Sequence, residues 1–211
     1  MRASDLIDPA ARQHLEAVVL EAERSTAGEL VVAVVTACDG YANVGWRLGV
    51  LAAGAALIGL ELLVPGSPWW LLLGVQAIAL TAAHTAARVP AVRRKLLPAD
   101  VVETRVHERA QRCFREQGLT RTRGRTGILL FVALLERRVV VLADEGIHRV
   151  LDPDERWEQV VDLVLAGLRA GRGVEGLEAG VRRCGEILAR HVPIVPGREL
   201  DELPNAIVVE D

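Results

Sequence analysis

The sequence is poor in aromatic residues, and it lacks several short motifs that identify common enzyme classes. Phe, Trp and Tyr together make up 3% of the 211 residues. No segment matches the phosphate-binding loop GxxxxGK[ST] or the nucleophile elbow GxSxG. The sequence therefore contains no catalytic motif strong enough to name a reaction.

Long basic runs and paired cysteines are also absent. The chain has 25 Lys and Arg against 28 Asp and Glu, a net charge of −3, and the two signs are interspersed. Because a basic patch is the electrostatic footprint of nucleic-acid binding, this distribution predicts no nucleic-acid partner. The three cysteines, Cys38, Cys113 and Cys184, are widely spaced and form no CxxC motif. They predict reduced cytoplasmic thiols rather than disulfides or a zinc site.

Two apolar segments, Trp46–Val64 and Trp69–Val89, dominate the first half of the chain. Each is close to the roughly 20 residues that a helix needs to cross about 30 Å of hydrocarbon. The PGSP segment at Pro65–Pro68 predicts a turn between them. The pattern therefore predicts a helical hairpin that enters the bilayer and returns on the same side. The alternative is a pair of buried helices in a soluble core, but such helices normally carry a polar stripe that these segments lack.

Small residues on both segments predict close packing within the hairpin, since they let two helix backbones approach each other in a membrane. They are Gly49, Ala53 and Ala56 in the first segment and Gly74, Ala77 and Ala82 in the second. Gln76 and His84 are expected to form hydrogen bonds across the same interface.

The ends of the hairpin predict its interfaces and its orientation. Interfacial aromatics and flanking cations gather at the membrane surface, and six residues here fit that pattern: Trp46, Trp69, Trp70, Arg93, Arg94 and Lys95. The connecting turn carries no charge, whereas the cations follow the second segment. The positive-inside rule then predicts a multi-pass membrane protein with its soluble domain and both termini in the cytoplasm.

The segments on either side of the hairpin alternate between helices and strands. Asp8-Pro9 is a typical helix start, because Asp caps free amides and Pro fits the first turn. Continuous apolar, β-branched runs of strand length predict strands buried on both faces. The expected elements are a helix over 9–24, a strand over 29–37, the hairpin, a helix from about 99 to Gly118, strands over 127–135 and 138–143, and helices after Asp152-Pro153 and over 174–191.

This order predicts an α/β fold, a three-layer sandwich with a small mixed sheet flanked by helices and an inserted transmembrane helical hairpin. The strands at Glu29 and Gly127 are separated by a helix, so we expect them to be parallel and adjacent. The strand at Arg138 should return antiparallel. Residues 1–45 and 90–192 would form one discontinuous domain around the hairpin at 46–89, and residues 193–211 an extended acidic tail.

Several segments resemble the TPM domain family. They are TAGELVVAVVTA at Thr26–Ala37, RTGILLFVALLERRVVVLADEGIHRVL at Arg125–Leu151, Trp157, and Gly176-Leu177. The ending HVPIVPGRELDELPN is similar to that of the family's bacterial membrane-hairpin branch, with Asp201 at the first position of an NELP-like motif. The resemblance implies an α/β sandwich, often with transmembrane segments. Some plant members are described as acidic phosphatases, and others bind a divalent metal or serve membrane proteins as accessory subunits.

Four polar residues follow predicted strands and form the candidate site. Asp39 follows the first strand, and Asp144, Glu145 and His148 follow the last. Ligands often bind where strands end, and carboxylate oxygens suit calcium or magnesium. The three acids would be metal ligands with His148 beside them, and the metal would polarise a phosphoester. The alternative is that the acids are turn residues that form local backbone hydrogen bonds.

Two functions remain open at this point. The preferred one is a non-enzymatic cytoplasmic domain, held at the bilayer, that binds a membrane protein or a second copy of itself. The hairpin favours it, as does the acidic, apolar tail Leu200–Val209, which could dock as a strand. The alternative is a metal-assisted phosphohydrolase that uses Asp39 and Asp144, and the family resemblance favours that alternative.

Overall fold

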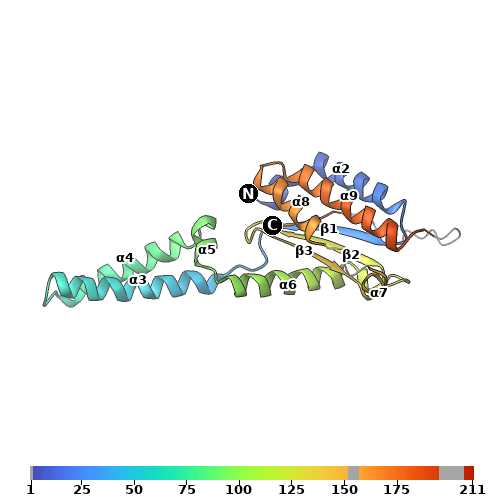
Figure 1. Ribbon diagram of the computed structural model, residues 1–211. Helices are drawn as coiled ribbons and strands as arrows, with labels where there is room; N and C mark the ends of the chain where they lie inside the picture. Colours follow the sequence, from blue (N-terminus) through green and yellow to red (C-terminus); the bar gives the residue numbers. More distant parts are fainter. Residues whose placement is uncertain (1, 152–156, 195–206) are drawn as a thin grey trace. The chain divides into compact units, whose positions relative to one another are not determined.

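The computed structural model describes residues 2–151, 157–194 and 207–211 (Figure 1). The chain divides into two compact units. One comprises Met1–Cys38 and Glu103–Asp211, and the other comprises Asp39–Val102. The second unit is longer than the predicted hairpin at 46–89, because it also includes the short helix α5 (Pro90–Leu96) and the first residues of α6 (Ala99–Glu116).

A four-stranded sheet in the order β3-β2-β1-β4 forms the centre of the first unit. β1 (Glu29–Val35) and β2 (Gly127–Ala133) are parallel, and every residue of both is buried. Because neither face meets water, both strands are continuous apolar runs without alternation. β3 (Arg138–Ala143) returns antiparallel to β2. The predicted adjacency and directions of these three strands are confirmed.

Helices cover both faces of this sheet. α2 (Pro9–Glu23), α8 (Glu158–Arg169) and α9 (Gly173–His191) lie on one face, and α6 lies on the other (Figure 1). Alternate residues of β1, such as Leu30 and Val32, join the core beneath α2 and α9. On α6 the buried positions Val106, Ala110 and Cys113 recur at helical spacing. The mixed sheet flanked by helices is therefore confirmed.

Local sequence signals set several helix boundaries. The Asp8 carboxylate accepts a hydrogen bond from the Ala11 amide at 2.7 Å, which caps α2. Gly118, two residues after the end of α6 at Glu116, has a φ of +74°, as expected of a glycine that ends a helix. The start predicted at Asp152-Pro153 lies outside the described residues. The short helices that the sequence did not predict are α5, α1 (Ala3–Leu6), η1 (Leu119–Arg121) and α7 (Glu145–Val150).

The segment GRGVEG at Gly171–Gly176 has the glycine spacing of a dinucleotide-binding loop, but it connects two helices. Gly171 has a φ of +72° and ends α8. A Cβ on Gly167 would lie 2.5 Å from the Gly176 Cα, so these glycines let α8 and α9 pack in contact. The dinucleotide fingerprint follows a strand, so these glycines serve helix packing.

The end of the chain belongs to the sheet. β4 (Val208–Glu210) pairs parallel with the end of β1, and the Ile207 side chain is fully buried in the core. Asp211 accepts hydrogen bonds from the hydroxyls of Ser4 and Thr36 at 2.6 and 2.9 Å. The prediction of a tail separate from the domain is wrong for 207–211, because the open edge of β1 is filled by this chain's own strand. Residues 195–206, with most of the predicted docking segment, lie outside the described residues.

The second unit contains the two apolar helices. α3 (Ala42–Leu63) and α4 (Trp69–Ala86) are connected by a short turn at the predicted position. Both are long and apolar enough to cross a membrane, with mean hydropathies of 1.6 and 1.3 in their most apolar stretches. Of those stretches, 6% and 0% of residues are buried. Neither helix is therefore a buried core helix.

The packing of α3 on α4 corrects part of the small-residue prediction. Gly49 is buried, and a Cβ there would lie 2.8 Å from the Leu80 side chain. The predicted close packing is therefore confirmed at Gly49 of the first segment. Gly45, one turn earlier, approaches His84 in the same way. Gly74 has open space around its Cα and is exposed. The prediction is wrong for Gly74 in the second segment, and Ala77 and Ala82 are exposed as well, because the packed face of α4 passes through Leu80 and His84.

Candidate functional site

Asp144 is the most constrained of the predicted site residues. It directly follows β3, and only 6% of its surface is exposed. Its carboxylate accepts two hydrogen bonds from the Arg125 guanidinium, from Nε at 2.8 Å and from Nη2 at 3.0 Å. It also accepts a hydrogen bond from the Glu145 amide at 2.8 Å and caps α7. The Arg125 guanidinium and the Glu145 amide together occupy both oxygens of the Asp144 carboxylate. Asp144 therefore has a structural role, because it anchors Arg125 and the start of α7.

The loop beside Asp144 adopts a conformation that fits few residues. Arg125 has a φ of +54°, in the left-handed region that disfavours non-glycine side chains. The Arg125 carbonyl accepts a hydrogen bond from the Gly146 amide at 2.9 Å. A Cβ on Gly146 would lie 2.2 Å from the Gly124 carbonyl oxygen. The ion pair and the missing Cβ together hold the start of β2 against the start of α7.

Asp39 is exposed and makes a local turn. Its carboxylate accepts a hydrogen bond from the Tyr41 amide at 3.2 Å, two residues along the chain. This is the local side-chain to backbone bond that Asp forms in turns. Tyr41 has a φ of +47° and precedes the first residue of α3. Asp39 therefore shapes the entry into α3.

The strand register places Asp144 and the last residue of β1 at opposite ends of the strands. Ala143, at the end of β3, lies opposite Ile128 at the start of β2. Cys38 lies at the other end of the strands, beside the β2–β3 turn, because its amide donates a hydrogen bond at 2.9 Å to Glu136 in that turn. Seven-residue strands separate the two ends by roughly 20 Å. The expectation that the residues after β1 and after β3 converge overlooked the reversal of β3, which puts Cys38 and Asp144 of the first unit at opposite ends of the strands.

Glu145 and His148 are exposed on α7. The Glu145 carboxylate forms an ion pair with Arg149, four residues later, at 2.6 Å. Across the parts of the chain that are described, no three His, Cys, Asp or Glu side chains gather into a group that could hold a metal ion. Calcium or magnesium binding by Asp39, Asp144 and Glu145 stays a prediction.

The two buried cysteines, Cys113 and Cys184, have the properties of inert thiols. All three cysteines are free. Burial raises the pKa of Cys113 to about 11 and that of Cys184 to about 12. At neutral pH both are protonated, and a protonated thiol is a poor nucleophile. A role for either as a catalytic nucleophile is therefore disfavoured.

Sequence reasoning missed Arg125 as the partner of Asp144. The signal was present, because an antiparallel third strand must end beside the start of its neighbour. It also missed Glu136, a buried acid in the β2–β3 turn that holds the Cys38 amide. Glu136 fixes the chain where it leaves the sheet after β1.

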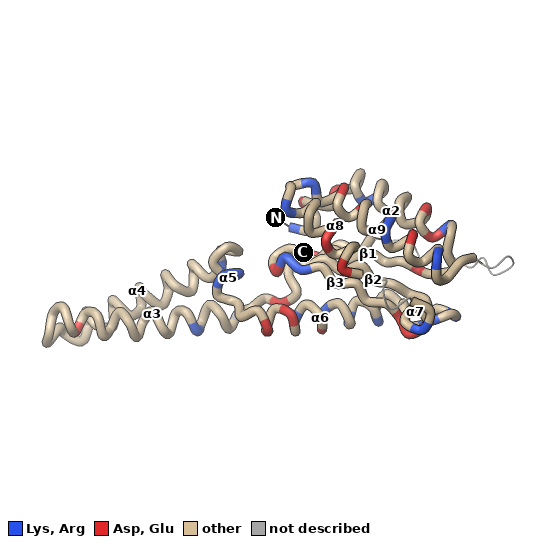
Figure 2. The backbone as a smooth tube through the Cα atoms, in the orientation of Figure 1, with Lys and Arg blue, Asp and Glu red and all other residues tan. Residues whose placement is uncertain are grey.

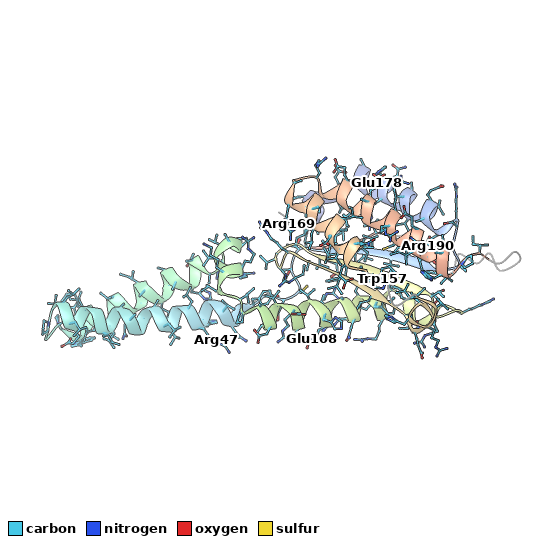
Figure 3. The ribbon with its side chains drawn as sticks, in the orientation of Figure 1. Arg47, Glu108, Trp157, Arg169, Glu178 and Arg190 are labelled. Carbon is cyan, nitrogen blue, oxygen red and sulfur yellow. The ribbon has the colours of Figure 1, made fainter. Side chains whose placement is uncertain are left out.

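The predicted interface residues of the second unit are mostly exposed. Trp69 and Trp70 are 73% and 61% exposed at the start of α4, and Trp46 is 57% exposed. The Trp46 ring lies 5.0 Å from the His84 ring, centroid to centroid. Arg47 points away from α4 (Figure 3). Arg93, Arg94 and Lys95 occupy the last turn of α5.

The sequence and the fold are similar to those of known proteins. Residues 88–187 match the model of the TPM domain family. None of the curated proteins matches the sequence. Among solved structures, the BA42 protein of the psychrophilic bacterium Bizionia argentinensis is 18% identical with a TM-score of 0.56, over 96% of this chain and 93% of that one. The N-terminal domain of a P. gingivalis protein is 16% identical with a TM-score of 0.48, over 90% and 83%.

The family match covers the segment from the end of α4 to α9, which includes β2, β3 and the Arg125–Asp144 pair. The similarity to BA42 shows a shared fold. The resemblance to the TPM domain family is confirmed for residues 88–187, which match the family's model.

Proposed function

We propose that this chain is a membrane-anchored TPM-like domain of the bacterial inner membrane that serves membrane proteins as a non-enzymatic binding module. The observation that carries the proposal is the exposure of the apolar helices. Leu51 and Leu62 on α3 are 71% and 77% exposed, and Ile78 on α4 is 71% exposed. Moving one such side chain from water to an apolar environment is worth about 1.5–3 kcal/mol. Two helices of such residues favour a bilayer over water.

Charge supports the orientation. α3 carries Arg47 near its start and Glu61 near its end, and Glu61 accepts a hydrogen bond from the Gly66 amide in the turn at 3.0 Å. All other cations of the second unit follow α4. The positive-inside rule then assigns the open end of the hairpin, and both termini, to the cytoplasm.

A membrane-protein partner is supported by the outer face of α4. A shallow groove runs along it, lined mainly by small side chains such as Ala77, Thr81 and Thr85. The Thr81 and Thr85 hydroxyls donate hydrogen bonds to carbonyls of their own helix at 2.7 and 2.6 Å. Faces of small residues with satisfied polar groups allow close packing of transmembrane helices.

Cysteine accessibility tests the anchor. We expect Ser67→Cys, in a Cys38→Ser background, to react with a membrane-impermeant maleimide in intact cells, because Ser67 lies in the turn. The native chain, with Cys38, is the matched control and should react only after permeabilisation. Alkaline carbonate should leave both chains in the membrane pellet. Extraction by carbonate, or labelling of the native chain from outside while the Ser67→Cys variant stays unlabelled, would contradict the proposal.

A phosphatase assay tests the non-enzymatic part. We expect the purified chain to hydrolyse no phosphoester above background, with or without calcium or magnesium. Asp39→Asn is the informative variant, since Asp39 is exposed and its loss leaves the sheet intact. Metal-dependent turnover that Asp39→Asn abolishes would favour the phosphohydrolase instead.

A further inference from the structure

The segment that follows α4 gathers cations without acids. Arg88, Arg93, Arg94 and Lys95 lie within eight residues, and no Asp or Glu occurs between Glu61 and Asp100. Figure 2 shows this cluster on α5. Among the residues that the structure describes, none of the four forms an ion pair; Arg93 donates only a hydrogen bond to the Ala87 carbonyl at 3.4 Å. The cluster is therefore uncompensated charge.

α5 combines these cations with an exposed apolar side. Val89 is 48% exposed and Leu96 is 38% exposed. With Val92, they share one side of the helix at i, i+3 and i+7 spacing. Arg93 and Lys95 lie on either flank of that side. An apolar side flanked by cations is the pattern of a helix that lies in the headgroup region of a membrane.

The position of α5 in the chain supports the same placement. Only three residues separate the end of α4 at Ala86 from the start of α5 at Pro90. If α4 spans the bilayer, α5 cannot lie far from the headgroups. At the other end of the hairpin, the turn from Val64 to Pro68 carries no charge. The cluster is thus confined to one membrane surface.

We infer that α5 is a binding surface for anionic phospholipid headgroups, which Arg88, Arg93, Arg94 and Lys95 collect around the open end of the hairpin. This inference rests on the proposed membrane anchoring. The occupant follows from charge complementarity, since four cations without acids face a surface that carries phosphate-bearing lipids. Each cation close to an anionic membrane changes binding by about fivefold.

Lipid selectivity tests the inference directly. The full chain is reconstituted into vesicles of phosphatidylcholine and phosphatidylglycerol that contain a spin-labelled analogue of one or the other. We expect the protein to restrict the labelled phosphatidylglycerol with a preference of about fivefold or more over phosphatidylcholine. That preference should weaken as ionic strength rises toward 1 M, where the Debye length falls to about 3 Å.

Two triple variants separate a local site from net charge. Arg93→Gln, Arg94→Gln and Lys95→Gln together should lower the preference severalfold, to no more than the contribution of the remaining Arg88. The matched control replaces three exposed arginines of the other unit by glutamine: Arg121, Arg169 and Arg172. It removes the same charge and should keep the preference. Equal loss in both variants, or no preference in the native chain, overturns the inference.

The same experiment distinguishes failure of the inference from failure of the anchor. A chain that inserts restricts some lipid of either kind. Restriction of both lipids without preference overturns the headgroup site and leaves the anchor standing. A chain that restricts neither lipid is not in the bilayer, and both proposals then fail.

Discussion

The buried end of the chain offers the sharpest test of the sheet topology. Ile207 is fully buried in the core although it stands only four residues from the end of the sequence. Its carbonyl accepts a hydrogen bond from the Arg12 guanidinium on α2, and the next residue, Val208, pairs with Ala33 of β1. Ile207→Ala removes the buried side chain and leaves these backbone contacts available.

The expected cost follows from the burial. Replacing a fully buried Ile by Ala typically destabilises a protein by about 2–5 kcal/mol, through lost transfer energy and a residual cavity. Ile207 lies near the edge of the core, where relaxation is easier, so we expect about 2–3 kcal/mol. Val208→Ala is the matched control. Because Val208 is only half-buried, it should cost about 1 kcal/mol or less.

Urea denaturation of the detergent-solubilised full chain measures these costs. Far-UV circular dichroism is one probe, and the other is the fluorescence of Trp157 in a background where Trp46, Trp69 and Trp70 are replaced by Phe. Trp157 packs against the core of the first unit. A free-energy loss below about 0.5 kcal/mol for Ile207→Ala, the range of ordinary surface substitutions, would refute the docking of β4. An equal loss for Val208→Ala would refute the burial argument.

Three further predictions follow from the packing and burial. Gly49→Leu should loosen the packing of α3 on α4, because even a Cβ at this position would lie 2.8 Å from the Leu80 side chain. A disulfide between cysteines introduced on the two helices should then form more slowly, and an unchanged rate would contradict the contact. Asp144→Ala should destabilise the first unit by about 2–3 kcal/mol in the same urea assay, since a cap and a charge-assisted hydrogen-bond acceptor are lost, and a neutral result would contradict its role as an anchor. In the folded chain at pH 8, Cys113 and Cys184 should resist alkylation, and rapid alkylation of either would contradict its burial. Burial raises their pKa values from 9.0 to about 11 and about 12, so the stability that the two protonated thiols contribute is present below pH 9 and falls as the pH rises toward those values.

The pairing of Asp144 shows where the sequence was sufficient and where it was misinterpreted. The apolar, β-branched runs at Glu29 and Gly127 predict buried strands, and the short turn after Ala133 predicts an antiparallel return. These directions already place Asp144 beside the start of β2. The partner Arg125 follows from the topology, whereas its φ of +54° and the close approach of Gly146 do not, since they depend on atoms from two segments.

The sequence by itself determined the elements that depend on local patterns. Two segments of about 20 apolar residues predict the paired helices, and Asp8-Pro9 and Gly118 predict helix ends. Only the tertiary structure decided the contacts between distant segments. Val208 pairs with β1 although the two are far apart in the sequence. Gly49 lies against Leu80 of α4, whereas Gly74 has open space around it. The reason is physical: periodicity reports whether a residue is buried, whereas its partner is set by how whole elements pack.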